Sequence, residues 1–200
     1  SVDGWDAGNL DGVRLGVCTP WLEHADPPVV AACRSAVDAF RDAGASIVEV
    51  DVPELALLRT VHMVTIASEM QASQLSGWAE RRKRIGHDIR LNMAITRHAT
   101  SGDYIHAQRH RTRFCRQWAE LLGRVDAVLI PATACTAPPL RPAALRTGDS
   151  DLATGDRIMR NSLPANLTGQ PAISFPVGYD PGAMPIGMQA VGRAWNEALL

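Results

Sequence analysis

The chain has 200 residues, 46% of them hydrophobic, and a formal net charge of −1. This content can bury one sizeable core and leaves little room for a second, so we expect a single domain over residues 1–200. The near-zero charge provides no global field to attract nucleic acid or an anionic membrane, and no apolar run approaches the roughly 20 residues of a membrane helix. We therefore expect no nucleic-acid partner and no membrane partner.

The first elements along the chain predict a β-α-β unit. Residues 13–18 and 46–50 are short apolar runs bounded by turn signals, which is typical of buried strands. Between them, apolar residues at helical spacing predict a helix that Asp26 can cap and Gly44 can close. Two strands connected in this way usually pair in parallel within one sheet.

Helices, a long loop and further strands follow. The apolar patterns predict helices over residues 54–76, 81–98 and 104–122, with Asp103 as the cap of the last, and strands over 126–131, 172–176 and 186–192. Residues 132–156 show no period and predict a loop with at most a short helical turn. The predicted fold class is α/β, a mixed and largely parallel sheet flanked by helices.

The cysteines and the single lysine limit the redox state and the catalytic mechanisms that the sequence allows. Cys18, Cys33, Cys115 and Cys135 are widely spaced with no C-x-x-C pair, which favours reduced thiols in a cytoplasmic protein. Lys83 is the only lysine, so a mechanism that needs an amine has one candidate. Because Lys83 lies in a run of four basic residues, a hydrated surface cation is the better interpretation.

Familiar catalytic and ligand-binding motifs are missing from the sequence. It contains no G-x-x-x-x-G-K-[ST], no G-x-G-x-x-G and no G-x-S-x-G. His106 and His110 have the spacing of a zinc pair, but Ala107 stands where a metalloprotease motif has Glu, which favours a solvated basic helix. We expect no metal ion and no cofactor.

The C-terminal stretch "LPANLTGQPAISFPVGYDPGAMPIGMQAVGR" resembles the C-terminal portion of the amidase signature family of serine hydrolases. The positions that carry the resemblance are Asn166, Gly169, Pro171, Ala172, Pro176, Gly178, Pro185, Ile186, Gly187 and Gln189. A weaker resemblance extends over residues 11–200, through "VRLGV", "AGASIVEVDVP" and "DAVLIPAT". It implies an amidase-signature fold and the cleavage of a carboxamide to an acid and ammonia or an amine.

The resemblance also implies that the catalytic groups lie elsewhere. The family uses a nucleophilic Ser, a second Ser and a proton-accepting Lys, with both serines in a Gly/Ser-rich segment upstream of the matched region. These 200 residues contain no such segment, and Lys83 does not correspond to that lysine. We therefore expect no catalytic residue here and interpret the chain as a C-terminal fragment that supplies core and cleft wall. The alternative is a non-catalytic amidase-like subunit or binding module.

Three partners follow from the fragment interpretation: a small-molecule amide, the N-terminal signature half of the same enzyme and, as an open alternative, a second copy of the chain. The resemblance further implies four substrate-binding candidates. Thr133, Arg160 and Asn166 correspond to the acyl-binding side of the cleft. Arg90 lies on a helix that resembles the substrate-arginine region of glutaminase members, although a surface salt bridge is the alternative. Met159 stands where those members have an acidic residue, which argues against glutamine as the substrate.

Overall fold

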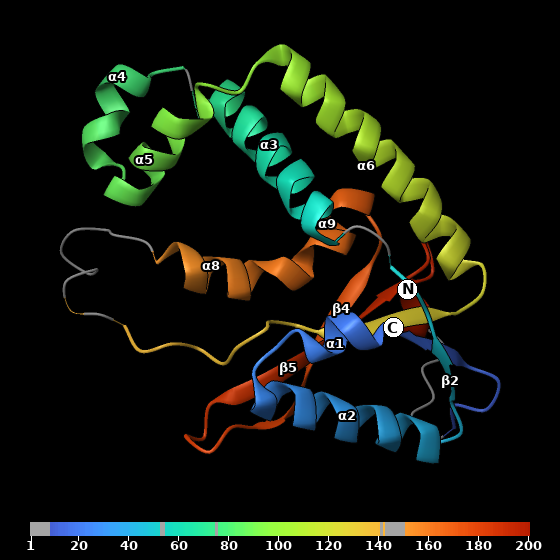
Figure 1. The fold of residues 1–200 in the computed structure, drawn as a ribbon. Helices are drawn as coiled ribbons and strands as arrows, with labels where there is room; N and C mark the ends of the chain where they lie inside the picture. The colour runs from blue at the N-terminus through green and yellow to red at the C-terminus, as the bar shows by residue number, and fades with distance from the viewer. Residues whose placement is uncertain (1–8, 53–54, 75, 141, 143–150) are drawn as a thin grey trace. The chain divides into compact units, whose positions relative to one another are not determined.

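The computed structural model describes residues 9–52, 55–74, 76–140, 142 and 151–200, which contain a five-stranded sheet and helices (Figure 1). The chain divides into two compact units, and each is described by itself. Residues 1–53, 114–138 and 156–200 form the sheet unit, and residues 54–113 and 139–155 form the helical unit. The single-domain expectation over residues 1–200 stays a prediction.

All five strands belong to the sheet unit and follow the order β2-β1-β3-β5-β4. Their bounds are β1 Arg14–Val17, β2 Ser46–Glu49, β3 Ala127–Pro131, β4 Ala172–Tyr179 and β5 Pro185–Gly192. β1 pairs in parallel with β2 and β3, whereas β5 is antiparallel to both β3 and β4. Four strands therefore run in one direction and β5 runs against them, which confirms the mixed, largely parallel sheet.

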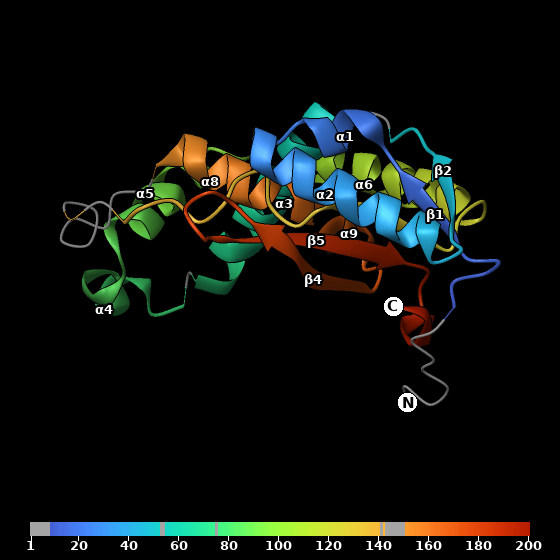
Figure 2. The same cartoon turned by 90° about the horizontal axis from the view of Figure 1, so that it is seen from below.

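One face of the sheet packs against α2, Pro27–Asp42 (Figures 1 and 2). Strand alternation directs Leu129 of β3 and Met188 of β5 to this face, where both are almost fully buried. Phe40 of α2 meets Phe175 of β4 edge to face, with ring centroids 5.9 Å apart. Each fully buried apolar side chain of this size contributes about 1.5–3 kcal/mol of transfer free energy. The predicted β-α-β unit is confirmed.

The opposite face is covered within the sheet unit by α9, Leu163–Thr168, and by the C-terminal part of α6, Ser101–Leu122 (Figure 1). The Cys115 Sγ of α6 lies 3.7 Å from the Leu167 carbonyl oxygen of α9. Trp118 of α6 and Val128 of β3 are among the most deeply buried side chains. The central strand β3 is therefore buried along its whole length, as its apolar sequence requires, whereas β4 at the edge is largely exposed.

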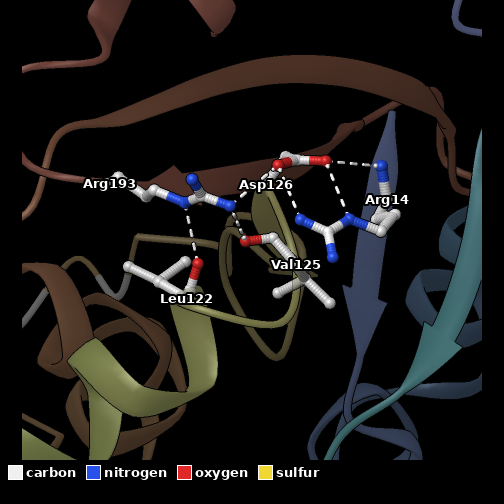
Figure 3. Close-up of polar contacts among 5 residues, drawn as sticks. All are labelled: Arg14, Leu122, Val125, Asp126 and Arg193. Atoms are coloured by element: carbon white, nitrogen blue, oxygen red, sulfur yellow. Dashed lines mark hydrogen bonds and ion pairs between the residues drawn. The ribbon is translucent and has the colours of Figure 1, made fainter. Parts of the chain in front are cut away.

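Asp126 joins the amino ends of β1 and β3 to the end of β5 (Figure 3). Its carboxylate accepts hydrogen bonds from the Arg14 backbone N–H at 2.8 Å and from Arg193 Nη2 at 2.9 Å. Arg193 also donates to the carbonyls of Leu122 and Val125, at 2.7 and 3.2 Å. Burial acts to raise the pKa of Asp126, but these hydrogen bonds and the two guanidinium groups outweigh it, so the pKa lies below its usual value.

The helical unit contains α3, Leu55–Gln74, α4, Trp78–Arg81, a short 3-10 turn η1, Arg82–Arg84, α5, His87–Thr96, and the first part of α6. The predicted continuous helix over residues 81–98 is wrong. Ile85 and Gly86 are extended, with ψ of 139° and 154°, so the chain restarts a helix at His87. Gln71 of α3 donates to Thr96 Oγ1 of α5 at 2.7 Å, which ties these two helices together.

Thr100, and not Asp103, caps α6. The Asp103 carboxylate accepts from the Thr100 backbone N–H at 2.8 Å, and the Asp103 backbone N–H donates to Thr100 Oγ1 at 3.1 Å. These reciprocal bonds form a capping box and start the helix at Ser101, earlier than predicted. The hydrogen bonds from the Thr100 backbone and side chain lower the pKa of Asp103.

The segment after β3 is irregular through residue 140, as predicted. Residues 141 and 143–150 of the predicted loop lie outside the described residues. Helix α8, Leu152–Met159, begins inside the predicted loop and continues into a 3-10 turn, η2, Arg160–Ser162. The remaining elements are α1, Thr19–Glu23, and a C-terminal turn, η3, Glu197–Leu199. None of the described helices has the length and apolar character needed to cross a membrane.

Candidate functional site

The carboxyl ends of β1 and β3 form the edge of the sheet where a ligand site is expected. From β1 the chain passes to β2 on one side, and β3 later adds on the other side, so the strand order reverses between β1 and β3. In open α/β sheets, ligands bind outside the carboxyl ends of the strands at such a point. A hydrogen bond of 2.8 Å from the Asp26 backbone N–H to the Ala134 carbonyl joins the segments that follow these two strands.

A recess of about 210 Å³ lies at this edge, within the sheet unit. Its lining residues are Glu23, His24, Ala25, Asp26, Ala134, Arg157 and Arg160. The Asp26 side chain, which was predicted to cap α2, makes no capping bond and instead forms an ion pair with Arg157. The recess therefore carries paired charges contributed by the segment after β1 and by α8.

Arg160 is the most constrained side chain of the recess. Its Nη1 donates to the His24 carbonyl at 3.1 Å, and its Nη2 pairs with the Asp156 carboxylate at 3.0 Å. The side chain is only 10% exposed, and its Nε is buried without a hydrogen-bond partner in the described part of the chain. Burial and the neighbouring Arg157 lower the pKa of Arg160, but a guanidinium stays charged at neutral pH. Arg160 is therefore a fixed cation that can bind a carbonyl or carboxylate oxygen.

The turn that carries Arg160 is held by a buried glutamine of β5. Gln189 Nε2 of β5 donates to the Asn161 carbonyl at 2.9 Å and reaches the Pro131 carbonyl, at the end of β3, at 3.4 Å. Asn161 is 2% exposed, and its Nδ2 has no partner among the described residues. Gln189 thus anchors the turn that carries Arg160 to the ends of β3 and β5. The sequence analysis missed Asn161, although it directly follows a predicted site residue.

Thr133 lies in the segment after β3, and its hydroxyl makes a hydrogen bond within that segment. Thr133 Oγ1 donates to the Cys135 carbonyl at 2.7 Å. The next residue, Ala134, donates its backbone N–H to the Arg157 carbonyl at 2.9 Å. The structure therefore brings the segments that carry Thr133 and Arg160 together, but it does not direct the Thr133 hydroxyl to Arg160.

The two other predicted residues are not part of the recess. Asn166 lies on α9 with an exposed side chain, and within the described part of the chain no hydrogen bond joins it to Arg160. Arg90 lies exposed on α5 in the helical unit. Substrate binding by Thr133, Arg160, Asn166 and Arg90 stays a prediction.

Comparison with known proteins identifies the family of the chain. The model of the Amidase family matches residues 5–200. The chain belongs to the amidase family. The resemblance carried by the C-terminal stretch is thus confirmed.

Relatives from the family match almost the whole chain. It is 39% identical over 199 residues to a fatty acid amide hydrolase of Medicago truncatula, an alignment that covers 98% of this chain and 33% of the relative. It is 36% identical over 193 residues to a fatty acid amide hydrolase of Arabidopsis thaliana, covering 94% of this chain and 32% of the relative. The chain therefore spans about a third of the length of these curated relatives.

Solved amidase structures share the fold. A crystal structure of an amidase superposes with a TM-score of 0.81 at 23% identity, covering 95% of this chain and 44% of that one. A subunit of the glutamyl-tRNA(Gln) amidotransferase of Thermotoga maritima gives a TM-score of 0.73 at 22% identity, covering 95% and 40%. The expected amidase fold is confirmed.

Burial affects two of the cysteine thiols of this amidase-family chain. Burial raises the pKa of the Cys18 thiol, and it raises that of Cys33 to about 11. Both thiols are therefore protonated and unreactive at neutral pH. Lys83 is exposed on η1. In the described part of the chain, no group of three or more His, Cys, Asp or Glu residues could hold a metal ion.

Proposed function

We propose that the chain is part of an amide hydrolase that cleaves a carboxamide to an acid and ammonia or an amine. The observation that carries the proposal is the match of the amidase family model to residues 5–200. In this proposal the chain contributes core and one wall of the substrate cleft. Arg160 supplies the fixed cation of that wall, Thr133 and Asn166 lie on the acyl side, and Arg90 contacts a charged substrate group.

The reacting groups in this proposal come from outside these 200 residues. A serine attacks the amide carbonyl, backbone N–H groups stabilise the oxyanion, and water then releases the acyl group as the acid. Two observations on this chain support the proposal that another part of the enzyme supplies the reacting groups. The buried thiols of Cys18 and Cys33 are protonated, and the only lysine is an exposed surface cation.

We further propose a substrate with an apolar acyl group rather than glutamine. The identity is 39% to the fatty acid amide hydrolase of Medicago truncatula and 28% to a glutamyl-tRNA(Gln) amidotransferase subunit of Chloroflexus aggregans. Met159, which stands where glutaminase members have an acidic residue, is exposed and neighbours Arg160. A thioether at this position cannot hold a substrate ammonium group as a carboxylate can.

The partner that we propose for the sheet unit is the signature half of the same enzyme. In the described residues β4 pairs only with β5, so its other edge presents unpaired backbone groups. Large apolar side chains are exposed on the same unit, among them Ile173 and Tyr179 of β4 and Trp195 after β5. An open edge beside exposed apolar surface favours pairing with another chain segment. A second copy of this chain is the competing occupant, which light scattering across a concentration series detects as self-association.

A cytoplasmic location belongs to the same proposal. All four cysteines are free, and three of them, Cys18, Cys33 and Cys135, are buried. Free thiols are typical of a reducing compartment.

Ammonia release from oleamide, benzamide and glutamine tests the proposed activity. We expect no hydrolysis by the chain alone, and hydrolysis of oleamide in preference to glutamine when the chain is joined to the signature half. In that assembly Arg160→Gln should lower the rate, whereas Arg41→Gln, on the exposed side of α2, should not. Turnover by the chain alone that survives Lys83→Ala would contradict our assignment of the chemistry, and an inactive assembly would favour the binding-module alternative.

A further inference from the structure

The helical unit contains a hollow that no step of the proposed hydrolysis uses. It has a volume of about 530 Å³, which is within the usual range for small-molecule sites. Side chains of α3, of the connection between α5 and α6, and of the first turn of α6 line it. Those that matter here are Ser68, Glu69, Arg97, Ser101 and Tyr104, all within the helical unit.

The polar walls of this hollow are held in place by hydrogen bonds. The Tyr104 hydroxyl of α6 donates to Glu69 Oε1 of α3 at 3.3 Å, which orients the carboxylate. Gln71, also of α3, donates to Thr96 Oγ1 at 2.7 Å, directly before Arg97. These bonds link all three helices around the hollow, so both charged residues are carried by a connected frame.

The two charges of the hollow are not paired with each other. Among the residues that the structure describes, Glu69 accepts only from Tyr104, and Arg97 makes no ion pair or side-chain hydrogen bond. In the recess of the sheet unit, by contrast, Arg157 is paired with Asp26 and Arg160 with Asp156. A carboxylate and a guanidinium that line one hollow without meeting each other leave room for a ligand between them.

We propose that this hollow binds a small zwitterion of the amino-acid class. Its ammonium group donates to the free oxygen of Glu69, and its carboxylate accepts from the guanidinium of Arg97. Ser68 and Ser101 line the same hollow. Such charge-assisted hydrogen bonds are about twice as strong as neutral ones. A ligand with a single charge gains only one of these contacts and leaves the other charged residue without a partner, so both charges of the ligand contribute to binding.

This site differs from the one expected on α5. The sequence analysis named Arg90 as a substrate-binding candidate, but Arg90 is exposed and does not line the hollow. Arg97, at the end of the same helix, does line it. The proposal goes beyond amide hydrolysis, and binding can be measured without turnover, so its failure leaves the proposed activity untouched.

Titration of the whole chain with matched probes tests the site. Glycine, β-alanine and γ-aminobutyrate vary the separation of the two charges, and butyrate and butylamine each carry one charge of γ-aminobutyrate. Calorimetry, with amide shifts of Arg97 and Tyr104 as a local readout, should show binding of at least one zwitterion. Butyrate and butylamine should bind at least about tenfold more weakly than the best zwitterion, the loss of one charge-assisted contact.

Variants give the second arm of the test. Arg97→Gln and Glu69→Gln should each weaken zwitterion binding about tenfold. Arg109→Gln, an exposed arginine of α6 that does not line the hollow, should leave the affinity unchanged. Circular dichroism confirms that each variant is folded. Binding of butyrate as tight as that of the zwitterions, affinity unaffected by Arg97→Gln, or no binding by any zwitterion would overturn the proposal.

Discussion

Three arginines of the two units are held to different degrees. In the sheet unit, Arg193 spans a carboxylate and two carbonyls, and Arg160 is nine-tenths buried between His24 and Asp156. In the helical unit Arg97 is exposed and lines a hollow without a partner among the described residues. Arg193 therefore fixes the positions of backbone segments, and Arg160 is held in one orientation while its Nε has no partner among the described residues. Arg97 has its whole guanidinium available to a ligand.

The same contrast extends to the apolar side chains. Leu129 of β3 is 1% exposed in the sheet unit, whereas Leu91 of α5 is 49% exposed in the helical unit. Leu129→Ala should lower the free energy of unfolding by about 2–5 kcal/mol, because it removes transfer energy and leaves a cavity. Leu91→Ala should change it by about 0.5 kcal/mol or less. Urea unfolding of the two variants measures the difference, and similar losses would show that Leu91 is covered in solution.

The next largest effect is expected at Asp126. Asp126→Asn keeps the shape but removes the charge that Arg14 and Arg193 share, so we expect a loss of about 1–3 kcal/mol. Asp103→Asn in the capping box of the exposed α6 terminus should cost less. The pair is compared by chemical denaturation at neutral pH. An equal or smaller loss for Asp126→Asn would mean that the Asp126 clamp contributes little net stability.

The pH dependence of the same clamp has a defined sign. The folded-state pKa of Asp126 is lowered, so its contribution is complete above the unfolded pKa of about 3.9 and is lost as the pH falls through the folded value. The difference in stability between the wild type and Asp126→Asn should therefore be constant near neutral pH and shrink in acid. Unfolding titrations from neutral to acidic pH measure this difference, and growth of the difference in acid would contradict the pKa shift.

Substitutions of Arg160 and Arg97 are expected to change the free energy of unfolding by smaller amounts, and the two can be compared directly. Arg160→Gln removes hydrogen bonds to His24 and Asp156 from a buried position, so it should lower stability by about 1–2 kcal/mol. Arg160→Lys should not restore it, because an ammonium cannot reproduce the planar fork of a guanidinium. Arg97→Gln should stay within about 0.5 kcal/mol of the wild type. Thermal and urea unfolding give the values, and a destabilised Arg97→Gln would reveal a partner that occupies Arg97 in the free chain.

The strands and α2 could be predicted from the sequence because their apolar periods are strong and their ends carry turn residues. The helices after residue 151 were not predicted: α8 begins inside residues 132–156, which show no helical period, and α9 is only six residues long. Pro164 occupies the first turn of α9, and Gly169 closes it in the left-handed conformation, with φ of 72°. Arg160 and Thr133 were identified by resemblance alone. His24 and Asn161 had no local signal, since the Arg160–His24 contact joins residues 136 positions apart.

The last comparison is between the predicted cap Asp26 and the observed cap Thr100, whose substitutions should change the free energy of unfolding only slightly. Thr100 makes a reciprocal capping box with Asp103 at α6, so Thr100→Ala should cost about 1 kcal/mol, and Thr100→Ser should retain most of the stability because it keeps the hydroxyl. Asp26 precedes α2 but makes no capping bond, so Asp26→Ala removes only a half-exposed ion pair with Arg157, worth about 0.5 kcal/mol. Urea unfolding monitored by helical circular dichroism resolves the two. A larger loss for Asp26→Ala would mean that its carboxylate caps α2 in solution. The N-termini of α2 and α6 would then both be capped by a side chain.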